Sequence, residues 1–598
     1  MAGPMGGPPG SKHAPIKAKN LKLTFKKLLK ELHYIKWQTI SVLILTIFSV
    51  ILAIYTPKLT EKAITELLNT FLGLQVDLNY IAKILIIAGS LYLISTTFGI
   101  ISRYIMGSAS QKLVYSLRKR VRAKIDRVPL KYYDQNSTGD LISRVTNDLD
   151  KIGTSLNQSI TQVFSSILSV VGVIVMMLSI NVWLTLISLV SIPLSVLTAG
   201  VFIKRTQKHF STQAKSLGQV SGLVEETYTN QKTVKAFNKE KDTLKEFSKK
   251  NEELKNASIK ANFFSGMIYP LINFISNFGY VAVTVAASIF ISNGNLNPGY
   301  LIVFLQYSQQ LTQPIGQMAQ LSNIVQTLLA SSERVFEVLE QEEEVKNELN
   351  AVNLTNINGE VEFKNVKFGY NPDKILMKDV NFKVNKGQMI ALVGPTGAGK
   401  TTIVNLIMRF YELNGGNILI DNKDLKNFTR QSLRKNIGMV LQDTWLFNGT
   451  IKDNIAYGKK DATLEEIIEA SKLAQAHHFI KTLPHGYDTV INEETTNISE
   501  GQKQLLTIAR AVLASPKILI LDEATSSVDT RTEILIQKAF ENLMKNKTSF
   551  VIAHRLSTIQ NADSILVLNN GDIIEKGSHK ELLKQKGFYY DSYNSQLS

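Results

Sequence analysis

The chain has 598 residues, more than one hydrophobic core usually holds, so two or more domains are expected. Its 67 Lys and Arg against 50 Asp and Glu give a formal net charge of +17, which suits a nucleic acid or an anionic membrane surface. Cysteine is absent, which excludes disulfides, cysteine-bound zinc and thiol catalysis.

Residues 1–20 are rich in Gly, Pro and Lys, a composition that cannot bury a core and predicts a disordered tail. The next segment has apolar residues at helical spacing with lysines between them, and the apolar positions are Leu21, Phe25, Leu28, Leu29 and Leu32. This pattern is typical of an amphipathic helix on a membrane interface, although a helix packed on protein would share it.

Six long apolar stretches follow, none with an acidic residue once the ends are trimmed. They cover about 38–60, 80–104, 156–180, 182–205, 262–292 and 299–325. Each is near or beyond the roughly 20 residues that cross a bilayer, so residues 21–332 are predicted to form an all-α transmembrane domain with six spans.

Lysines and arginines gather before the first span and between the second and third, whereas 179–182 and 292–298 carry no charge. Because positive loops stay in the cytoplasm, both termini are predicted to be cytoplasmic, and the basic balance favours a membrane partner over nucleic acid. Helix formers continue beyond spans two to five, with breaks near 133–140 and 226–235, which predicts two long cytoplasmic hairpins.

Polar side chains recur on one helical face of each of the last two spans. The fifth span carries Asn273, Ser276, Asn277 and Tyr280, and the sixth carries Gln306, Gln310, Gln313, Gln317 and Gln320. Polar groups facing lipid are costly, so these faces should line either interhelical hydrogen bonds or a substrate cavity. The cavity residues so predicted are Asn273, Asn277, Gln306, Gln310 and Gln313.

Residues 333–357 are predicted to be a linker, because Glu333–Glu348 is a charged helical run. From 358 to 598 strands and helices alternate, which predicts an α/β P-loop nucleotide-binding domain. Its motif G-x-x-x-x-G-K-[ST] stands between an apolar strand at 389–393 and a helix at 403–408. The predicted nucleotide contacts there are Gly394, Pro395, Thr396, Gly397, Ala398, Gly399, Lys400, Thr401 and Thr402.

Glycines let backbone N–H groups surround phosphate oxygens, and the helix N-terminus adds partial positive charge. Lys400 would reach the β- and γ-phosphates, and the Thr401 hydroxyl would hold Mg²⁺. Further on, an apolar strand ends at Asp522 and Glu523. Asp522 would hold Mg²⁺ through water, and Glu523 would accept a proton from the attacking water.

Taken in order with Ser499-Glu500-Gly501-Gln502, Asp529 and His554, these motifs resemble the ATP-binding cassette (ABC) family, and the six spans resemble a half-transporter of its exporter class. The resemblance implies that Tyr370 stacks on adenine and that Gln442 contacts Mg²⁺ and the attacking water. It implies that His554 holds the γ-phosphate, and that Ser499, Gly501, Gln502 and Asp529 act across a dimer of cassettes. The breaks near 133–140 and 226–235 would be the coupling helices.

The signature departs from the family pattern L-S-G-G-Q, because Glu500 stands in place of the first glycine. The segment Ile491–Thr495 also departs from the usual V-G-E-R-G, whereas the P-loop, Asp522, Glu523 and His554 are intact. This combination is typical of one subunit of a heterodimeric exporter with one degenerate ATP site.

The sequence therefore predicts a multi-pass membrane ATPase that uses ATP and Mg²⁺ to export amphipathic small molecules, drugs or lipids. Its partners would be the bilayer, its substrate and a second half-transporter, with no nucleic acid. The richness of the chain in Lys, Ile and Asn points to a bacterial source, and so to a bacterial membrane. A homodimeric lipid flippase is the alternative. An ABC importer, a soluble ATPase and a peptide exporter with a cysteine protease are disfavoured by the fused spans and the missing cysteine.

Overall fold

The structure is a computed structural model that describes residues 20–69, 76–355, 357–371, 373–442, 444–491, 497–522, 528–553 and 556–597. The chain divides into two compact units, one made of residues 1–128 and 132–342 and the other of 129–131 and 343–598. The boundary after residue 342 lies within 333–357, the segment predicted as a linker. The predicted tail lies outside the described residues, apart from Asn20.

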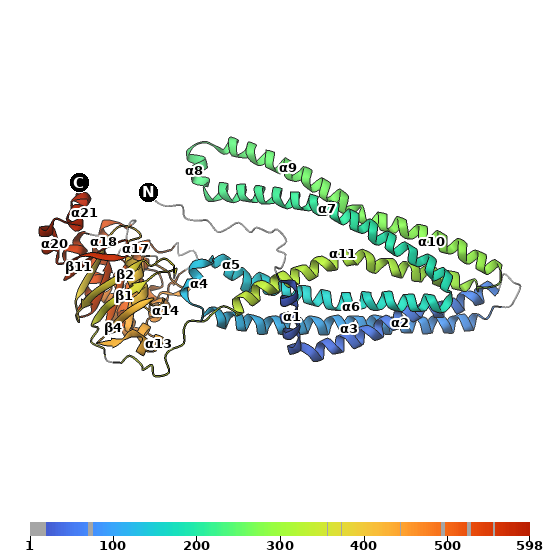
Figure 1. Ribbon diagram of the computed structural model, residues 1–598, viewed down its shortest axis with the longest axis horizontal. Coiled ribbons are helices and arrows are strands. Elements are labelled where there is room, and N and C mark those ends of the chain that lie inside the picture. Colours follow the sequence, from blue (N-terminus) through green and yellow to red (C-terminus); the bar gives the residue numbers. More distant parts are fainter. Residues whose placement is uncertain are drawn as a thin grey trace. The chain divides into compact units, whose positions relative to one another are not determined.

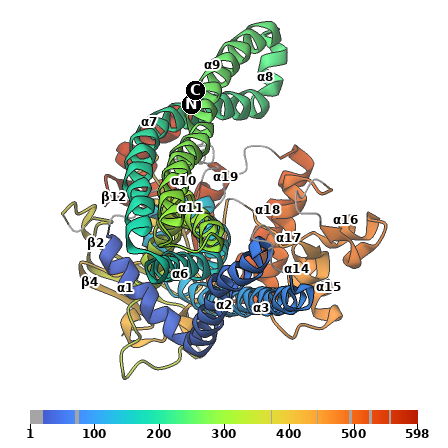
Figure 2. The ribbon, with the colours of Figure 1, turned by 90° about the vertical axis from the view of Figure 1, so that its right-hand side faces the viewer.

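Long helices build the first unit (Figure 1). They are α1 (Leu21–Leu32), η1 (His33–Ile35), α2 (Lys36–Asn69), α3 (Leu78–Ile125), α4 (Leu130–Gln135), α5 (Thr138–Ser143), the π-helix η3 (Arg144–Asp148), α6 (Leu149–Ile180), α7 (Val182–Thr229), α8 (Gln231–Ala236), α9 (Glu240–Gly266), α10 (Ile268–Ser292) and α11 (Gly299–Leu339). Helix α2 packs along α3, and α6 packs along α11, as the end-on view of Figure 2 shows.

Five helical segments among the described residues are long and apolar enough to cross a membrane. They are Leu21–Leu68, Leu78–Ile125, Thr138–Ile180, Val182–Thr229 and Glu240–Ser292. The sixth predicted span, 299–325, forms part of α11 but is not among the five, so the prediction of six spans holds only in part. This segment falls short of the others because its glutamines make it less apolar than they are.

The predicted breaks in the long hairpins are short helices in the structure. Helices α4 and α5 lie between α3 and η3, and Ser137 caps α5 by accepting a hydrogen bond from the Asp140 amide at 3.3 Å. Helix α8 stands at the tip of the hairpin formed by α7 and α9 (Figure 1). It has no buried residue, so this tip is solvent-exposed within the unit.

An ionic network joins the end of α11 to α5 and η3. The Arg334 guanidinium lies 2.8 Å from an Asp140 oxygen and 2.9 Å from an Asp148 oxygen. Arg144 lies 2.8 Å from Asp140 and 3.3 Å from Glu337. Asp148 is buried, with a side chain 4% exposed, so Arg334 supplies the charge that makes its burial tolerable.

The predicted charged helix Glu333–Glu348 is wrong beyond Leu339, where α11 ends. Tertiary bonds hold the following residues in a non-helical path. Arg434 lies 2.8 Å from Glu344, and Arg430 donates hydrogen bonds to the Val345 carbonyl and, through its backbone N–H, to the Asn347 side chain. These partners come from about 85 residues further along the chain, so local charge periodicity gives no sign of them.

The described residues of the second unit form three sheets. Their strands are β1 (Val361–Phe368), β2 (Met377–Val384), β3 (Met389–Val393), β4 (Gly415–Ile420), β5 (Lys423–Asp424), β6 (Ile437–Val440), β7 (Gly449–Thr450), β8 (Val490–Ile491), β9 (Ile518–Asp522), β10 (Thr548–Ile552), β11 (Ser564–Asn569) and β12 (Asp572–Gly577). The four-stranded sheet has the order β2-β1-β4-β5, the six-stranded sheet β12-β11-β3-β10-β9-β6, and the third is β7-β8. The six-stranded sheet is parallel except for β12.

Helices cover these sheets. They are α12 (Lys400–Ile407), η4 (Leu425–Asn427), α13 (Arg430–Asn436), α14 (Ile451–Ala456), α15 (Leu464–Leu473), α16 (His477–Thr482), η5 (Gly486–Asp488), α17 (Glu500–Ala514), α18 (Thr530–Met544), α19 (Leu556–Gln560), α20 (His579–Gln585) and α21 (Phe588–Leu597).

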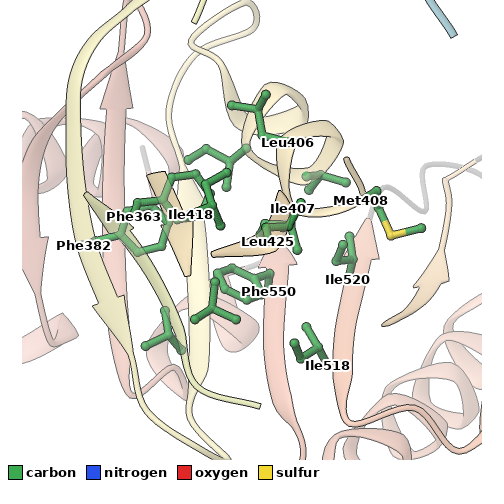
Figure 3. Packing of buried hydrophobic residues seen from close by; sticks show 14 of the residues in the cluster. Phe363, Phe382, Leu406, Ile407, Met408, Ile418, Leu425, Ile518, Ile520 and Phe550 are labelled. Carbon is green, nitrogen blue, oxygen red and sulfur yellow. The ribbon is translucent and has the colours of Figure 1, made fainter. Parts of the chain in front are cut away.

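The core between the four-stranded and six-stranded sheets fixes the position of the phosphate loop. Phe363 and Phe382 stack at 4.3 Å, and Phe550 of β10 lies 6.5 Å from Phe382 (Figure 3). Leu406 and Ile407 of α12 are buried in the same cluster. Because this core anchors α12, it also fixes the position of the C-terminal end of the loop that precedes the helix.

Candidate functional site

The loop between β3 and α12 has the backbone geometry of a phosphate cradle. Gly399 stands just before α12 with a φ of 104°, a left-handed conformation that a side chain rarely adopts. Lys400 is the first residue of the helix, and Thr401 beside it is exposed. The N-terminal N–H groups of α12 therefore lie open to an anion, as phosphate binding requires.

Lys400 contacts its own loop in this structure. Its ammonium donates hydrogen bonds to the Gly394 carbonyl at 2.7 Å and to the Pro395 carbonyl at 3.0 Å. Burial lowers the pKa of Lys400, and the nearby Asp522 carboxylate offsets part of that shift. The Lys400 ammonium is thus held against the carbonyls of the phosphate loop, close enough to the Asp522 carboxylate to interact with it electrostatically.

Asp522 and Gln442 lie at the ends of neighbouring strands. Asp522 ends β9, which pairs with β10, and β10 pairs with β3, so the acid and the loop stand at one edge of the sheet. Gln442 follows β6, which pairs with the other side of β9, and its side chain is exposed. Carboxyl ends of parallel strands meet at one edge, which is where ligands of such sheets bind.

Glu523 and His554, the predicted proton acceptor and γ-phosphate ligand, lie outside the described residues. Each immediately follows a described segment, one ending at Asp522 and the other at Ala553. Their proposed roles therefore rest on sequence position.

The residues present fit Mg²⁺. This ion prefers few protein oxygens together with phosphate oxygens and water. Thr401 is exposed at the helix start, and the Asp522 carboxylate interacts electrostatically with Lys400, so hydroxyl and carboxylate donors border the phosphate site.

Tyr370 stands beside the phosphate loop and presents an aromatic surface. It lies two residues beyond the end of β1 and is 42% exposed. Its hydroxyl lies 3.1 Å from the Thr402 hydroxyl of α12. An exposed ring so placed can stack on a nucleobase.

The signature residues form the start of α17. The Ser499 hydroxyl caps the helix by accepting a hydrogen bond from the backbone N–H of Gln502 at 3.3 Å. In return, the side-chain oxygen of Gln502 accepts one from the backbone N–H of Ser499 at 2.9 Å. Gly501 packs against α18, because a Cβ there would lie 2.4 Å from the Thr532 side chain. The glycine is therefore required by packing in this chain.

Glu500 has partners that sequence reasoning missed. Its carboxylate lies 2.6 Å from the Lys503 ammonium and accepts a hydrogen bond from the Thr444 hydroxyl at 3.4 Å. The side chain is 60% exposed, and that of Lys503 is 12% exposed. The spacing of three residues on a helix was a signal for the ion pair. Asp529 caps α18 by accepting a hydrogen bond from the Thr532 amide at 3.0 Å.

The predicted cavity residues lie on α10 and α11. Asn273, Asn277, Gln306 and Gln313 are exposed, and Gln310 is half-buried. The side chains of Gln317 and Gln320 lie outside the described part. Within the described part of the chain, neighbouring helices therefore leave Asn273, Asn277, Gln306 and Gln313 uncovered.

Residues 37–315 match the family described as "ABC transporter transmembrane region", and residues 377–526 match "ABC transporter". The chain is 43% identical over 583 residues to the uncharacterized ABC transporter ATP-binding protein YfiC of Bacillus subtilis, covering 97% of this chain and 95% of that protein. It is 45% identical over 523 residues to the fatty acid ABC transporter ATP-binding/permease protein of Mycobacterium tuberculosis, covering 88% and 83%.

Among solved structures, the chain is similar to a bacterial Atm1-family ABC exporter with ATP bound, with a TM-score of 0.75, 29% identity, and coverage of 95% of this chain and 99% of that one. The chain therefore belongs to the ABC transporter family. Within this family it is an exporter, a multi-pass membrane protein whose ATP-binding cassette is an ATPase coupled to transport.

Proposed function

We propose that this exporter moves small amphipathic molecules, drugs or lipids, outward by alternating access. The observation that carries the proposal is the exposed polar stripe of α10 and α11. Amide side chains facing lipid would lack hydrogen-bond partners, so they call for a polar or aqueous environment. A cavity between two half-transporters would supply it. The mycobacterial relative, named a fatty acid transporter, is consistent with an amphipathic substrate.

Single cysteines test this cavity directly, because the chain has none of its own. A cysteine in place of Asn277, Gln306, Gln310 or Gln313 should react with a water-soluble maleimide in one conformation and be protected, or newly exposed, with ATP plus vanadate. Phe278→Cys is the matched control: Phe278 is 64% exposed and, as the residue next to Asn277 on α10, points about 100° away from it around the helix, so it should stay unreactive in lipid. Labelling that ignores ATP plus vanadate would make the stripe a helix–helix contact.

The proposed catalytic roles follow the positions of the residues. Lys400 binds the β- and γ-phosphates, Glu523 accepts the proton of the attacking water, and Gln442 and His554 hold that water and the γ-phosphate. Tyr370 stacks on adenine. Thr401, Gln442 and Asp522 would hold Mg²⁺, which when bound neutralises charge on the phosphates.

The working unit in this proposal is a dimer in which this chain pairs with a different half-transporter. Its own Ser499, Gly501, Gln502 and Asp529 would face the partner's ATP, so Glu500 would stand beside that ATP. A carboxylate a few ångströms from γ-phosphate is a like-charge contact. One such site can hold ATP without rapid turnover, whereas a homodimer would carry Glu500 in both sites.

A homodimeric lipid flippase stays the second candidate, because the Lys503 ammonium lies 2.6 Å from Glu500 and offsets part of its charge. In either assembly the coupling segments near 133–140 and 226–235 would transmit cassette closure to the spans. Both termini and the ATPase unit would lie in the cytoplasm of a bacterial cell, below its plasma membrane.

A further inference from the structure

Two aromatic rings hold Tyr370 from the side. The ring of Tyr411 lies 5.0 Å away at 88°, and that of Phe368 lies 5.1 Å away at 79°. Edge-to-face pairs of this kind are favourable because a positive ring edge meets a negative ring face. These contacts fix the plane of the Tyr370 ring while 42% of the side chain stays exposed.

The hydroxyl of the same tyrosine is tied to the helix that follows the phosphate loop. The Thr402 hydroxyl lies 3.1 Å from it, and the Asn405 amide donates to it at 3.4 Å. Thr402 and Asn405 are three residues apart and therefore share one face of α12. Lys400, at the start of that helix, contacts the loop carbonyls.

Tyr370 follows β1 of the four-stranded sheet, whereas Thr402 and Asn405 belong to α12. The hydroxyl contacts thus set the distance between the exposed ring and the phosphate cradle. A nucleotide must satisfy both points at once, since its base and its triphosphate are joined through the ribose.

We propose that Asn405 and Tyr411 are positioning residues for the nucleobase of ATP. They hold the Tyr370 ring at the distance from the 394–402 loop at which the purine can stack on it while the phosphates of the same ATP occupy the loop. The proposal rests on the stacking role of Tyr370 given under Proposed function. It predicts that these side chains act on the base alone and leave phosphate binding unchanged.

Tripolyphosphate separates the two parts of the ligand, because it offers the phosphate chain without a base. The experiment measures Kd for ATP and for tripolyphosphate by calorimetry on the full chain in nanodiscs, without turnover and at 4 °C. The variants are Tyr370→Phe, Asn405→Ala, Tyr411→Leu and the double variant Tyr370→Phe/Asn405→Ala.

Tyr370→Phe keeps the ring and removes its anchor. We expect it to weaken ATP about two- to tenfold, the equivalent of one net hydrogen bond, with tripolyphosphate affinity unchanged. Asn405→Ala and Tyr411→Leu should weaken ATP by about twofold or more, again without effect on tripolyphosphate. The double variant should be no weaker than Tyr370→Phe, because both changes remove the same contact.

Asn542→Ala is the matched control. It removes a side-chain amide of α18 that donates a hydrogen bond to the Leu473 carbonyl of α15 at 3.0 Å, and it should change neither Kd. Equal losses for ATP and tripolyphosphate in Asn405→Ala and Tyr411→Leu would overturn the proposal and show a general disturbance of the cassette. Unchanged ATP affinity in Tyr370→Phe and Asn405→Ala would also overturn it. If Tyr370→Ala itself binds ATP normally, the stacking role fails as well, whereas Lys400→Ala should lose both ligands in every case.

Discussion

Lys400 and Asp522 lie at the ends of different elements, and each has a separate chemical part in the site. Lys400 begins α12 and Asp522 ends β9, yet the charge of one affects the pKa of the other. Glu523 follows Asp522 in sequence. The proposed division of labour has the lysine binding phosphate and the glutamate moving a proton.

Glu523→Gln should keep ATP binding and abolish most turnover. Removal of a general base lowers the rate by about 10²–10⁴-fold, while the isosteric amide leaves ground-state contacts in place. Steady-state phosphate release and ATP titration on the same sample measure both effects. Turnover near that of the native chain would make another residue the base.

The affinity for ATP should fall as pH rises towards 10, because only the ammonium form of Lys400 binds phosphate. Its pKa is lowered by burial, so the loss should begin below the value of about 10.4 for a free lysine. Above the pKa of the free site, affinity should fall by up to about tenfold per pH unit. Lys400→Arg, which stays charged, should show a flat profile of Kd against pH; a parallel fall in both proteins would assign the effect elsewhere.

Among elements, the end of α11 is held by charge. Arg334 of α11 bridges Asp140 of α5 and Asp148 of η3, so two adjoining elements and a helix far along the chain meet at one guanidinium. The network lies where the helix approaches the segment leading to the cassette. Its strength depends on burial, since Asp148 is almost fully enclosed.

Arg334→Ala should destabilise the transmembrane unit by about 3 kcal/mol, because it leaves the buried Asp148 without its cation. Thermal unfolding in detergent, followed by tryptophan fluorescence, measures the loss as a lower Tm. Lys239→Ala is the comparison: it removes an exposed pair with Asp242, with side chains 63% and 70% exposed, and should leave Tm unchanged. Equal Tm values for both variants would contradict a structural role of the network.

Sequence patterns predicted the elements that local rules define. The apolar strand, the glycine loop and the following helix at 389–407 share one short stretch, so the motif contains its own context. The helical linker was wrong because Arg430 and Arg434 reach it from far along the chain. The contacts of Asn405 and Tyr411 with Tyr370 have no local signal for the same reason, since Asn405 lies 35 residues from Tyr370 and Tyr411 still further along the chain.

At the scale of the whole molecule, Glu500 distinguishes two assemblies. In a heterodimer this chain supplies Glu523 to one site and Glu500 to the other. In a homodimer both sites combine them. In either assembly the ion pair with Lys503 would lower the negative charge that Glu500 presents to a facing nucleotide, while the bulk of its side chain would remain.

The native unit should contain a partner with an intact L-S-G-G-Q and a defective acid at the position matching Glu523. Copurification of this chain with the product of a neighbouring gene, followed by ATPase and transport assays, tests the pairing. In that heterodimer Glu500→Gly should change turnover only modestly, and Glu523→Gln should stop it. A dimer of this chain alone that hydrolyses ATP and transports at full rate would refute the heterodimer.

The hydrogen bonds from Lys400 to the Gly394 and Pro395 carbonyls make nucleotide entry an exchange reaction. A phosphate bound by Lys400 would displace two acceptors that the loop itself provides. The measured affinity would then be the difference between two sets of charge-assisted hydrogen bonds, with each bond worth about 1.5–3 kcal/mol net. The loop thus satisfies the lysine with its own carbonyls. Such a loop can release ADP readily, because the lysine regains its own carbonyls as the product leaves.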